Sequence, residues 1–535
     1  MENLSLLGQK WIFPKTATGT DFLSKLKKIR GIDASEIHDS QKMRDLPRAA
    51  QRIRTAIAQN EKILIVGDYD ADGITAAAIL FKVITQLGGL VSVRLPHRLR
   101  DGYGLNRNFI ESARALEVKL IITVDNGISA LHEIEFANEL GIETIITDHH
   151  TPPATLPPAF AIVNPKQKNC AYPEKNLSGA AVAMKLAENL GEIPPNLRDE
   201  IHALAAIGTL ADVCPLVGEN RALVATGLEL LPKVTNPGLQ KIIANAGLGA
   251  KISADDVGFR IAPRLNAAGR LDDPLLAFQT LVHPAGAKFA DELERLNRER
   301  QSWTADILDA VEEKLGELGA EKILIASGEF HPGIIGLAAA NLAEKYFRPA
   351  IVMSTKAENF VGSCRSPLAE FNLAEALESV GDLLEKFGGH HGAAGFTLAQ
   401  KNRSEFEKRI AEFAEKKIGA VELIPTLALD LAVEEKLLTE KFLRELQSLE
   451  PFGAGNPEPN LFLANTPLDD IRAIGADGKH LKMKVGAKKL TAIAFRFGEF
   501  AEKLGQKKRA DLVFNFGENA WNGNRELQLK IIDAR

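Results

Sequence analysis

Residues 62–73 read KILIVGDYDADG, and this stretch decides the expected fold of the chain. Its first five residues are mostly apolar and β-branched, which is typical of a strand buried on both faces. Three aspartates follow the strand, and a helical pattern then continues to about Leu87. A buried strand that leads directly into a helix is the start of a βαβ unit, so the stretch predicts a mainly parallel sheet.

The same alternation continues outward from this stretch. Short apolar runs predict further strands at residues 90–96, 119–125, 142–148 and 159–165. Helical patterns separate several of these runs, and residues 178–250 are mostly helical. Short apolar runs separated by helices indicate an α/β domain built around a parallel sheet.

Two changes of pattern divide the rest of the chain. Residues 286–318 form one long, charged helical pattern with few breakers, which predicts a connector between two lobes. A second α/β pattern begins with a strand at residues 322–326. From about residue 420 the chain has short alternating strands, many turns and a basic bias, which predict a small β-barrel or a turn-rich β-sandwich.

The composition is that of an ordinary soluble globular protein. The chain has 535 residues, 45% of them hydrophobic and 25% charged, which excludes a wholly disordered or collagenous chain. No stretch approaches the ~20 apolar residues that span a bilayer, and the N-terminus lacks the pattern of a secretory signal. The three cysteines, Cys170, Cys214 and Cys364, form neither a zinc-type spacing nor a disulfide framework, so we expect a cytoplasmic protein without a membrane anchor.

The charge balance leaves room for a nucleic-acid enzyme. A net charge of -5 argues against a protein covered in basic charge, but it allows a local basic groove. Residues 94–107 hold four arginines against one aspartate, and residues 479–489 hold five lysines and no acid. The alternative for both segments is an ordinary solvated surface.

Acids gather where three of the predicted strands end. These residues, in chain order, are Asp68, Asp70 and Asp72, then Asp125, then Asp148 with His149 and His150. A further acid, Asp212, follows an apolar helical stretch. The carboxyl ends of parallel strands meet at one edge of a sheet, so these side chains are expected to converge there.

Such a convergence calls for metal ions. A single aspartate after a strand is commonly a helix cap or a turn residue, but several crowded carboxylates repel one another, and burial increases that repulsion. Carboxylates with one or two imidazoles suit Mn²⁺ or Mg²⁺ rather than structural zinc. Two such ions ~3.5–4 Å apart can direct the in-line attack of water on a phosphate ester.

These residues resemble the DHH phosphoesterase superfamily. Its four successive motifs are matched by VGDYDADGITA (66–76), TVDNG (123–127), TDHH (147–150) and LADVCPL (210–216). The superfamily's associated domain is matched by HPGIIGLAA (331–339), GSCRS (362–366) and GGHHGAAGF (388–396). LEPFGAGNPEPNLF (449–462) resembles the segment that opens the OB-fold of the bacterial single-strand-specific DNA exonucleases of this superfamily. The resemblance covers about residues 45–535.

The resemblance implies an α/β multidomain protein with a C-terminal β-barrel. The implied parts are an N-terminal extension (1–44), a DHH catalytic domain (45–285), a connector helix (286–320), a DHH-associated α/β domain (321–419) and an OB-fold nucleic-acid-binding domain (420–535). It also implies a 5′-to-3′ exonuclease that hydrolyses single-stranded DNA to 5′-mononucleotides in recombination and repair. Two divalent cations, Mn²⁺ or Mg²⁺, are the implied cofactors. A single-strand-binding protein and a RecQ-type helicase are the implied protein partners, and we expect a monomer.

By the same resemblance, one set of residues holds the metals. The implied ligands are Asp70, Asp72, Asp125, His149 and Asp212, with Asp125 as the bridging carboxylate. Asp68 either caps its turn or completes the shell of the first metal. Val66 stands where related pyrophosphatases have a metal-binding histidine, so the full ligand set of the first metal stays open. His150 either contacts the scissile phosphate or orients His149, and Asp148 is expected to be structural.

A second set is implied to hold the substrate. The implied phosphate contacts are Arg98, Arg264, Ser363, Arg365 and His390, since the planar fork of arginine matches phosphate oxygens. His390 is expected near the scissile phosphate, with packing on small residues as its alternative. Tyr103 is the candidate for stacking on a base, and ordinary packing is the alternative.

Three other functions compete with this interpretation. The same metal motifs would serve a hydrolase of a small phosphate compound, although such an enzyme needs neither a basic barrel nor basic loops. A haloacid-dehalogenase-type phosphatase also has a DxD after a strand, but it does not explain the Asp-His-His tripeptide. A non-catalytic DNA-binding protein would avoid carboxylates near phosphate.

Overall fold

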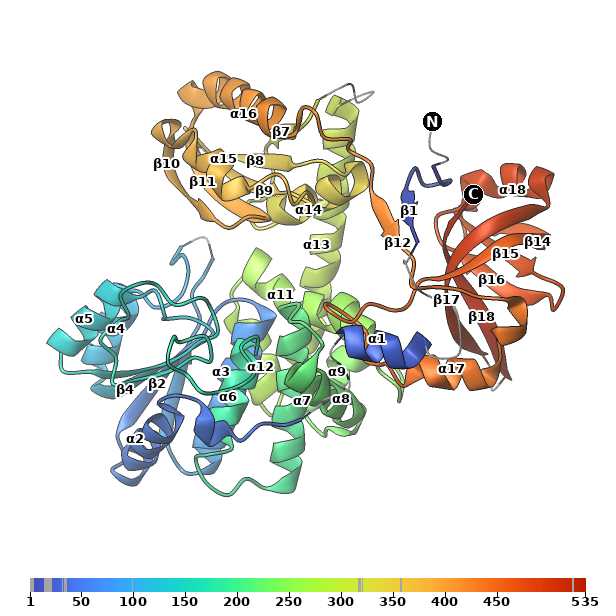
Figure 1. The fold of residues 1–535 in the computed structure, drawn as a ribbon. Coiled ribbons are helices and arrows are strands. Elements are labelled where there is room, and N and C mark those ends of the chain that lie inside the picture. Colours follow the sequence, from blue (N-terminus) through green and yellow to red (C-terminus); the bar gives the residue numbers. More distant parts are fainter. Residues whose placement is uncertain are drawn as a thin grey trace. The chain divides into compact units, whose positions relative to one another are not determined.

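The computed structural model describes residues 4–13, 22–30, 32, 36–98, 100–315, 319, 321–356, 358–521 and 524–535. The chain forms two compact units (Figure 1). One unit is Ser35–Val421, and the other combines Met1–Ala34 with Glu422–Arg535. Among the described helices, none combines the length and the apolar character needed to cross a bilayer.

The predicted parallel sheet is confirmed in the larger unit. Its strands are β2 (Lys62–Val66), β3 (Leu90–Arg94), β4 (Val118–Val124), β5 (Glu143–Thr147) and β6 (Ala161–Val163). They lie in the order β3-β2-β4-β5-β6, and every pairing is parallel. Both faces of β2 are buried, which explains its continuous run of apolar residues.

Helices cover both faces of this sheet (Figure 1). One face packs against α4 (Arg107–Ala115) and α5 (Leu131–Glu139). The other packs against α2 (Leu46–Ala58), α3 (Ala71–Gln86) and α6 (Gly179–Ala187). The carboxyl ends of the strands therefore meet at one edge between two helical layers, where ligands of such sheets bind.

A helical region follows the sheet, as the sequence predicts. Its helices include α7 (Pro195–Ala211), α8 (Gly218–Leu230), α9 (Pro237–Asn245), a short π-helix (Val257–Ile261), α11 (Ala262–Leu271) and α12 (Leu275–Val282). The expected long helix is α13 (Gly286–Leu315), whose 30 residues extend for about 45 Å. It ends in the core of the second α/β layer, where Ile307 and Val311 are buried.

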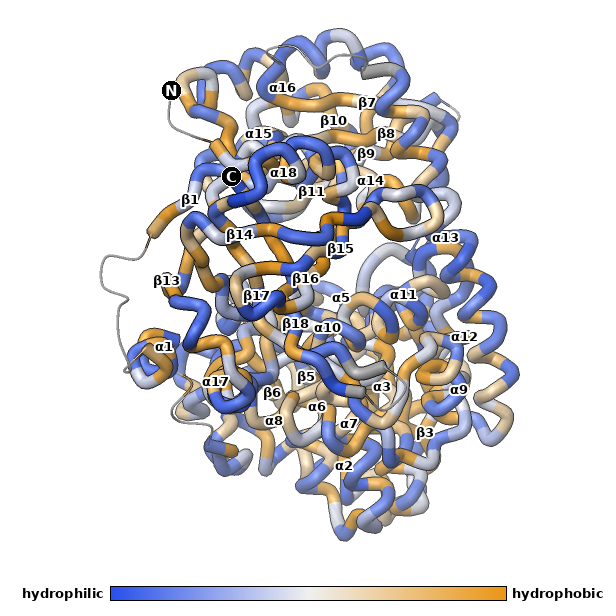
Figure 2. Tube along the Cα trace, turned by 90° about the vertical axis from the view of Figure 1, so that its right-hand side faces the viewer, coloured by the Kyte–Doolittle hydropathy of each residue, from blue (hydrophilic) through white to orange (hydrophobic). Residues whose placement is uncertain are grey.

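The second α/β region has a mixed sheet. Its strands are β7 (Leu324–Gly328), β8 (Ala350–Lys356), β9 (Asn359–Arg365), β10 (Leu384–Gly389) and β11 (Ala393–Ala399), in the order β10-β11-β9-β8-β7. Strands β7 and β8 run parallel to each other, and the other pairings of this sheet are antiparallel. Its helices are α14 (Ile335–Tyr346), α15 (Leu373–Glu378) and α16 (Arg403–Ile418). In Figure 2, β7 and β8 are mainly hydrophobic and α16 is mainly hydrophilic, which fits strands in the core and a helix at the surface.

The smaller unit contains the predicted barrel. Five strands close a ring in the order β14 (Leu461–Ile474), β15 (His480–Val485), β16 (Leu490–Ala494), β18 (Asn524–Ala534) and β17 (Arg509–Trp521), because β17 pairs back with β14. This closure confirms the OB barrel and excludes the turn-rich sandwich. The short strand β13 (Leu431–Ala432) adds to the start of β14.

The N-terminal residues belong to this smaller unit, which their weak pattern did not predict. Strand β1 (Lys10–Ile12) pairs with β12 (Thr426–Ala428). The Trp11 indole donates a hydrogen bond to Asp533 over 2.9 Å, inside a small apolar cluster. Helix α1 (Phe22–Arg30) is tied to the same unit by an ion pair of 3.2 Å between Arg30 and Asp430. The domain limits proposed from the sequence stay predictions.

Candidate active site

The carboxyl edge of the first sheet brings the predicted acids together. Asp70 is the N-cap of α3, and its side chain accepts hydrogen bonds from the backbone of Asp72 and Gly73, both over 3.1 Å. Asp72 lies in the first turn of α3 and accepts from the backbone N–H groups of Gly179 (2.7 Å) and Ala180 (2.8 Å). The N-terminus of α6 therefore holds Asp72 in place, as a helix N-terminus favours a carboxylate.

Asp125 occupies a strained position at the end of β4. Its φ of 61° lies in the left-handed region, which non-glycine residues seldom adopt outside functional or tightly held sites. Gly179 makes room for it, because a Cβ there would lie 2.5 Å from the Asp125 Cβ. The neighbouring structure therefore holds the Asp125 carboxylate close against the start of α6.

His149 lies between the carboxylates. Its Nε2 is 3.0 Å from Asp125 Oδ1 and 3.9 Å from Asp72 Oδ2, and its Nδ1 is 3.8 Å from Asp212 Oδ2. Burial lowers the pKa of His149, so the ring is available as a neutral ligand. The potential ligand atoms fall into three groups, each within 4.8 Å: Asp68, Asp70 and Asp125; Asp125, His149 and His150; and His149, Asp212 and Cys214.

The electrostatics of this edge are unfavourable without cations. Burial raises the pKa of Asp125 well above its usual range, and the charges of Asp72, Asp70 and Asp68 raise it further. Burial and the nearby acids also raise the pKa of Asp72 to about 8. Among the described residues, no group makes a hydrogen bond of acceptable geometry to the buried Asp68 Oδ1 or Asp125 Oδ1, although His149 Nε2 lies 3.0 Å from Asp125 Oδ1. Buried, unsatisfied carboxylate oxygens crowded in this way fit the oxygen-rich shell of Mn²⁺ or Mg²⁺.

Asp148 and His150 form a separate pair beside this cluster. Asp148 Oδ1 lies 2.7 Å from His150 Nδ1, and the Asp148 carboxylate also accepts backbone hydrogen bonds from His149, His150 and Ile128. Burial alone would lower the pKa of His150, but the bond to Asp148 raises it overall. These contacts occupy the Asp148 carboxylate, which favours a structural role for it, and the pairing favours the charged form of His150.

Tyr103 lies at the rim of this edge. Its hydroxyl donates a hydrogen bond to the Asp125 carbonyl oxygen over 3.2 Å, and its ring stands edge-on to His150 at 6.2 Å between centroids. About half of the side chain, 52%, is exposed. An aromatic face that is fixed at one end and open at the other suits stacking on a base, which stays a prediction.

A cluster of arginines lies next to the carboxylates, and we call it the arginine cluster: Arg98, Arg270, Arg300 and Arg365. Burial, with the charges of the other three, lowers the pKa of Arg270 to about 9. The Asp70 charge opposes that shift, and the charge of Arg98 likewise acts on Asp68. The Arg98 guanidinium also packs over the Tyr69 ring at 5.0 Å. Like charges held together in this way are suited to binding an anion.

The second α/β region completes the arginine cluster. Arg365 donates to Ser363 Oγ over 3.1 Å, and a Cβ at Gly336, in the first turn of α14, would lie 3.1 Å from that oxygen. Arg270 donates to the Gly333 carbonyl over 3.3 Å, just before α14. The arginines thus lie beside the N-terminus of a helix, which itself favours phosphate.

The structure places the other predicted substrate residues differently. The Arg264 guanidinium is occupied by the protein: it donates to Glu294 over 2.7 Å, to the Arg260 carbonyl over 2.5 Å and to the Asn245 carbonyl over 3.3 Å. Arg270, which closes the same APRLNAAGR segment, and Arg300 on α13 lie in the arginine cluster but were not among the predicted residues. His390 is exposed in the turn between β10 and β11, and its contact with phosphate stays a prediction.

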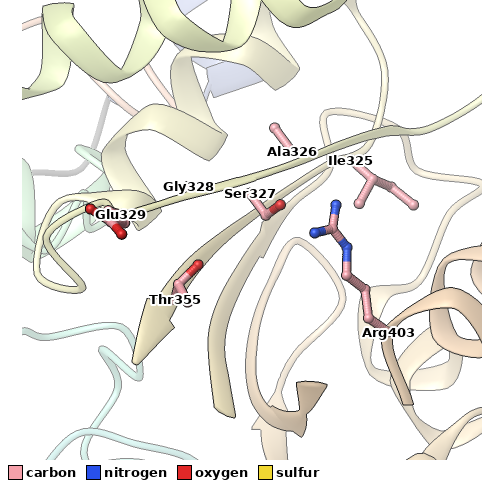
Figure 3. Close-up of a pocket in the computed structure, with 7 residues that line it drawn as sticks. All are labelled: Ile325, Ala326, Ser327, Gly328, Glu329, Thr355 and Arg403. Carbon is pink, nitrogen blue, oxygen red and sulfur yellow. The ribbon is translucent and has the colours of Figure 1, made fainter. Parts of the chain in front are cut away.

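A separate pocket of about 640 Å³ lies in the second α/β region. Strands β7 and β8 and the start of α16 line it, and Figure 3 shows the Arg403 guanidinium directed towards Ile325 and Ser327. Arg403 is paired with Glu407 over 2.7 Å and packs on the Phe360 ring. The pocket contains none of the clustered acids or arginines, so it plays no part in the candidate active site.

The lysine-rich strand of the barrel is less basic than its sequence indicates. Acids from neighbouring segments pair with Lys479 (Asp477, 2.7 Å), Lys484 (Glu526, 3.3 Å) and Lys489 (Asp469, 3.5 Å). Exposed pairs of this kind are weak and can be exchanged for phosphate. The barrel surface therefore offers a milder attraction to nucleic acid than five unopposed lysines would.

Known proteins share all three parts of this chain. Residues 62–209 match the DHH family, N-terminal domain; residues 320–416 match the DHHA1 domain; and residues 429–533 match the RecJ OB domain. The single-stranded-DNA-specific exonuclease RecJ of Bacillus subtilis is 38% identical over 539 residues, which cover 96% of this chain and 68% of that protein. The protein of the same name from Escherichia coli is 32% identical over 96% of this chain and 95% of its own length.

A solved structure agrees over nearly the whole chain. The crystal structure of RecJ in complex with Mn²⁺ from Thermus thermophilus has a TM-score of 0.83 and 30% identity, covering 98% of this chain and 79% of that one. The Mg²⁺ complex of the same protein has a TM-score of 0.77. The predicted resemblance to the DHH superfamily is confirmed, and the chain belongs to the RecJ family of DHH proteins.

Proposed function

We propose that this protein hydrolyses single-stranded DNA from its 5′ end by a two-metal mechanism and releases 5′-mononucleotides. One observation carries the proposal. A largely buried carboxylate cluster that needs cations lies within electrostatic reach of a partly buried arginine cluster that needs an anion, because the charges of Asp70 and Arg270, and those of Asp68 and Arg98, act on each other. A phosphodiester next to a terminal phosphate would satisfy both clusters at once.

The residues of the cluster would hold two Mn²⁺ or Mg²⁺ ions. We assign Asp70, Asp72, Asp125, His149 and Asp212 as ligands, with Asp125 between the two positions and Asp68 at the first. The Oδ1 atom of Asp68 is buried and unsatisfied, which favours a ligand role for Asp68 over a simple turn cap. Bound there, the ions supply a nucleophilic water at neutral pH and neutralise charge on the phosphate.

The chain's own residues orient the substrate. His150, charged through Asp148, would donate a hydrogen bond to a phosphate oxygen as negative charge develops on it. Arg98, Arg270, Arg365 and Ser363 would hold the 5′-terminal phosphate, and Tyr103 would stack on a base near the scissile bond. His390 would make a further contact near the scissile phosphate.

The barrel favours a polymer over a small phosphate compound. An OB barrel with exposed lysines provides a sequence-neutral track for a strand. The relatives are also named as single-stranded-DNA-specific exonucleases, which supports the same substrate. From the family we further propose a monomer in the cytoplasm that meets a single-strand-binding protein and a RecQ-type helicase during recombination and repair.

The test is digestion of end-labelled oligonucleotides with Mn²⁺. We expect a 5′-labelled single strand to release labelled mononucleotide at once, whereas a 3′-labelled strand shortens progressively. A blunt duplex of the same sequence should resist digestion. Equal digestion of duplex and single strand, or early release of the 3′ label, would refute the proposal.

A further inference from the structure

The cluster around Cys214 differs chemically from the carboxylate cluster, because it contains a thiol. Cys214 is buried, and its Sγ donates to Asp212 Oδ2 over 3.2 Å. His149 Nδ1 lies 3.8 Å from that same oxygen, and the ligand atoms of the three residues all lie within 4.8 Å of one another. In a tetrahedral zinc site with bonds of roughly 2.0–2.3 Å, neighbouring ligand atoms are about 3.3–3.8 Å apart. The two separations from Asp212 Oδ2, 3.2 Å to Cys214 Sγ and 3.8 Å to His149 Nδ1, are close to this range.

The end of α7 fixes two of these residues. The Cys214 N–H donates to the Thr209 carbonyl over 3.1 Å, and the Val213 N–H donates to the Leu210 carbonyl over 3.2 Å. This pairing ends a helix with one residue in the left-handed region, which is usually glycine. Here that residue is Val213, with a φ of 55°, and a β-branched side chain is strained there. The turn that places Asp212 beside Cys214 is thus maintained against a conformational cost.

His149 faces this cluster with one nitrogen and the carboxylate cluster with the other. Its Nε2 lies 3.0 Å from the unsatisfied Oδ1 of Asp125, and its Nδ1 points to Asp212. A neutral imidazole has a single free lone pair, so only one of the two nitrogens can ligate a metal at a time. A cation on Nδ1 therefore leaves a proton on Nε2 and removes that nitrogen from the carboxylate side.

We propose that His149 Nδ1, Asp212 and Cys214 form a second kind of metal site, which binds a soft divalent cation of the zinc class. As the metal–sulfur bond forms, the Cys214 thiol loses its proton to solvent. Zn²⁺ binds nitrogen, oxygen and sulfur ligands more tightly than Mn²⁺ does, and thiolate adds to that preference. Occupation withdraws His149 and Asp212 from the carboxylate cluster. The binding of this cation does not depend on the proposed nuclease function, whereas its inhibition of DNA hydrolysis rests on that function.

The direct test is a cadmium titration of the metal-free full-length protein. Cd²⁺ serves as the probe because a cadmium–thiolate bond absorbs in the ultraviolet. We expect about one equivalent of Cd²⁺ to produce this absorption in the wild type and in Cys170→Val. Cys170 is the matched control, a buried cysteine whose sulfur only accepts a backbone hydrogen bond from Arg44. The absorption should be lost in both Cys214→Val and Cys214→Ser, with folding checked by circular dichroism. No absorption in the wild type, or unchanged absorption in a folded Cys214 variant, would overturn the site.

A second measurement tests the inhibition. Zn²⁺ is added to single-stranded DNA hydrolysis supported by Mn²⁺, and each variant is normalised to its own rate without Zn²⁺. We expect half-inhibition of the wild type at a Zn²⁺ concentration at least about tenfold lower than for Cys214→Ser, since a lost ligand weakens metal binding by at least that much. Equal sensitivity would overturn the inhibition. If no hydrolysis is seen in Mn²⁺, the proposed function fails while the cadmium titration still decides the site.

Discussion

The carboxylate cluster and the arginine cluster are built alike but have opposite charge. Each gathers like charges, most of the carboxylates being buried and the arginines partly buried. In each, desolvation and the neighbouring charges shift a pKa towards the neutral form, upward for Asp125 and downward for Arg270. Neither arrangement is favourable by itself, because buried like charges repel. Cations would stabilise the carboxylates, and an anion such as phosphate would stabilise the arginines. The two clusters together therefore suit an anionic substrate that is bound through metal ions.

The clusters differ in how the chain assembles them. The carboxylates come from adjacent strands of one sheet and from the helix ends beside them, which are packed rigidly. The arginines come from a loop (Arg98), two helices (Arg270 and Arg300) and a strand of the other sheet (Arg365). We therefore expect the carboxylate side to be fixed before substrate arrives and the arginine side to depend on how the two α/β regions meet.

Removing one charge from the carboxylate cluster should have the largest effect. Asp125→Asn keeps a residue that tolerates the left-handed backbone but removes the proposed bridging charge. We expect turnover of single-stranded DNA at saturating Mn²⁺ to fall by at least about a thousandfold. The melting temperature of the metal-free protein should not fall, because the repulsion among the remaining acids decreases.

Glu139→Gln, on the exposed face of α5, is the control and should behave as wild type. A variant that keeps a tenth of the wild-type rate would disprove the bridging role.

The next largest effect is expected for Arg270, and a substitution of Arg264 serves as the comparison. Arg270→Met removes one charge from a repelling group, so we expect DNA affinity to fall about ten- to a hundredfold while the melting temperature is kept or raised. Arg264→Met should have the opposite effect. It removes the 2.7 Å partner of Glu294, which still pairs with Arg298 over 3.0 Å, and it removes the donor to two backbone carbonyls. We expect it to destabilise the fold by about 1–3 kcal/mol and to change DNA affinity little.

Fluorescence anisotropy of a labelled single strand and thermal melting measure the two quantities. If Arg264→Met loses affinity and Arg270→Met does not, the phosphate contact belongs to Arg264, as the sequence first predicted.

The different assembly of the carboxylate and arginine clusters explains which residues the sequence could predict. Most of the acids were predicted because they follow a strand, and a parallel sheet brings such positions to one edge; Asp212, at the end of α7, was added because its segment resembles a motif of the superfamily. Arg270 was not predicted, because its place in the arginine cluster depends on which face of α11 meets Gly333 and the second sheet, and no local pattern encodes that. The pairing of β1 with β12 was missed for a related reason: three residues carry too little periodicity, and their partner is more than 400 residues away.

The repulsion in the carboxylate cluster should also make stability depend on pH. Burial and the neighbouring acids raise the pKa of Asp72 to about 8 in the folded, metal-free protein, from the 3.8 of an unperturbed aspartate, which we take for the unfolded chain. A group with a raised folded pKa contributes its full stability below the unfolded value, and that contribution is lost as pH rises through the folded value. Metal-free protein should therefore lose stability between about pH 4 and pH 8, because Asp72 must ionise beside its neighbours.

Mn²⁺ offsets this loss, so its effect should grow with pH. We expect saturating Mn²⁺ to raise the melting temperature by about 3–8 °C at pH 8 and by less at pH 5. Differential scanning calorimetry at both pH values measures the gain, and Asp72→Asn should flatten the dependence. A gain that is larger at pH 5 would show that the acids are not crowded in the folded state.

We expect the smallest effect from removing a lysine of the barrel. Unlike the charges of the two clusters, three of the lysines at residues 479–489 already pair with acids. Lys482 is exposed on β15, and no described acid lies within ion-pairing distance of it. Lys484, in contrast, bonds to Glu526 (3.3 Å) and Thr491 (2.8 Å). A phosphate contact releases a counterion, so Lys482→Ala should reduce the salt-dependence slope of single-strand binding by about 0.7. Lys484→Ala should reduce it less, because Glu526 neutralises part of that charge. Both slopes come from anisotropy titrations at several salt concentrations, with Asp125→Asn as the background to prevent cleavage. If neither slope changes, the barrel does not contact phosphate through this strand, and the carboxylate and arginine clusters account for the ionic part of binding.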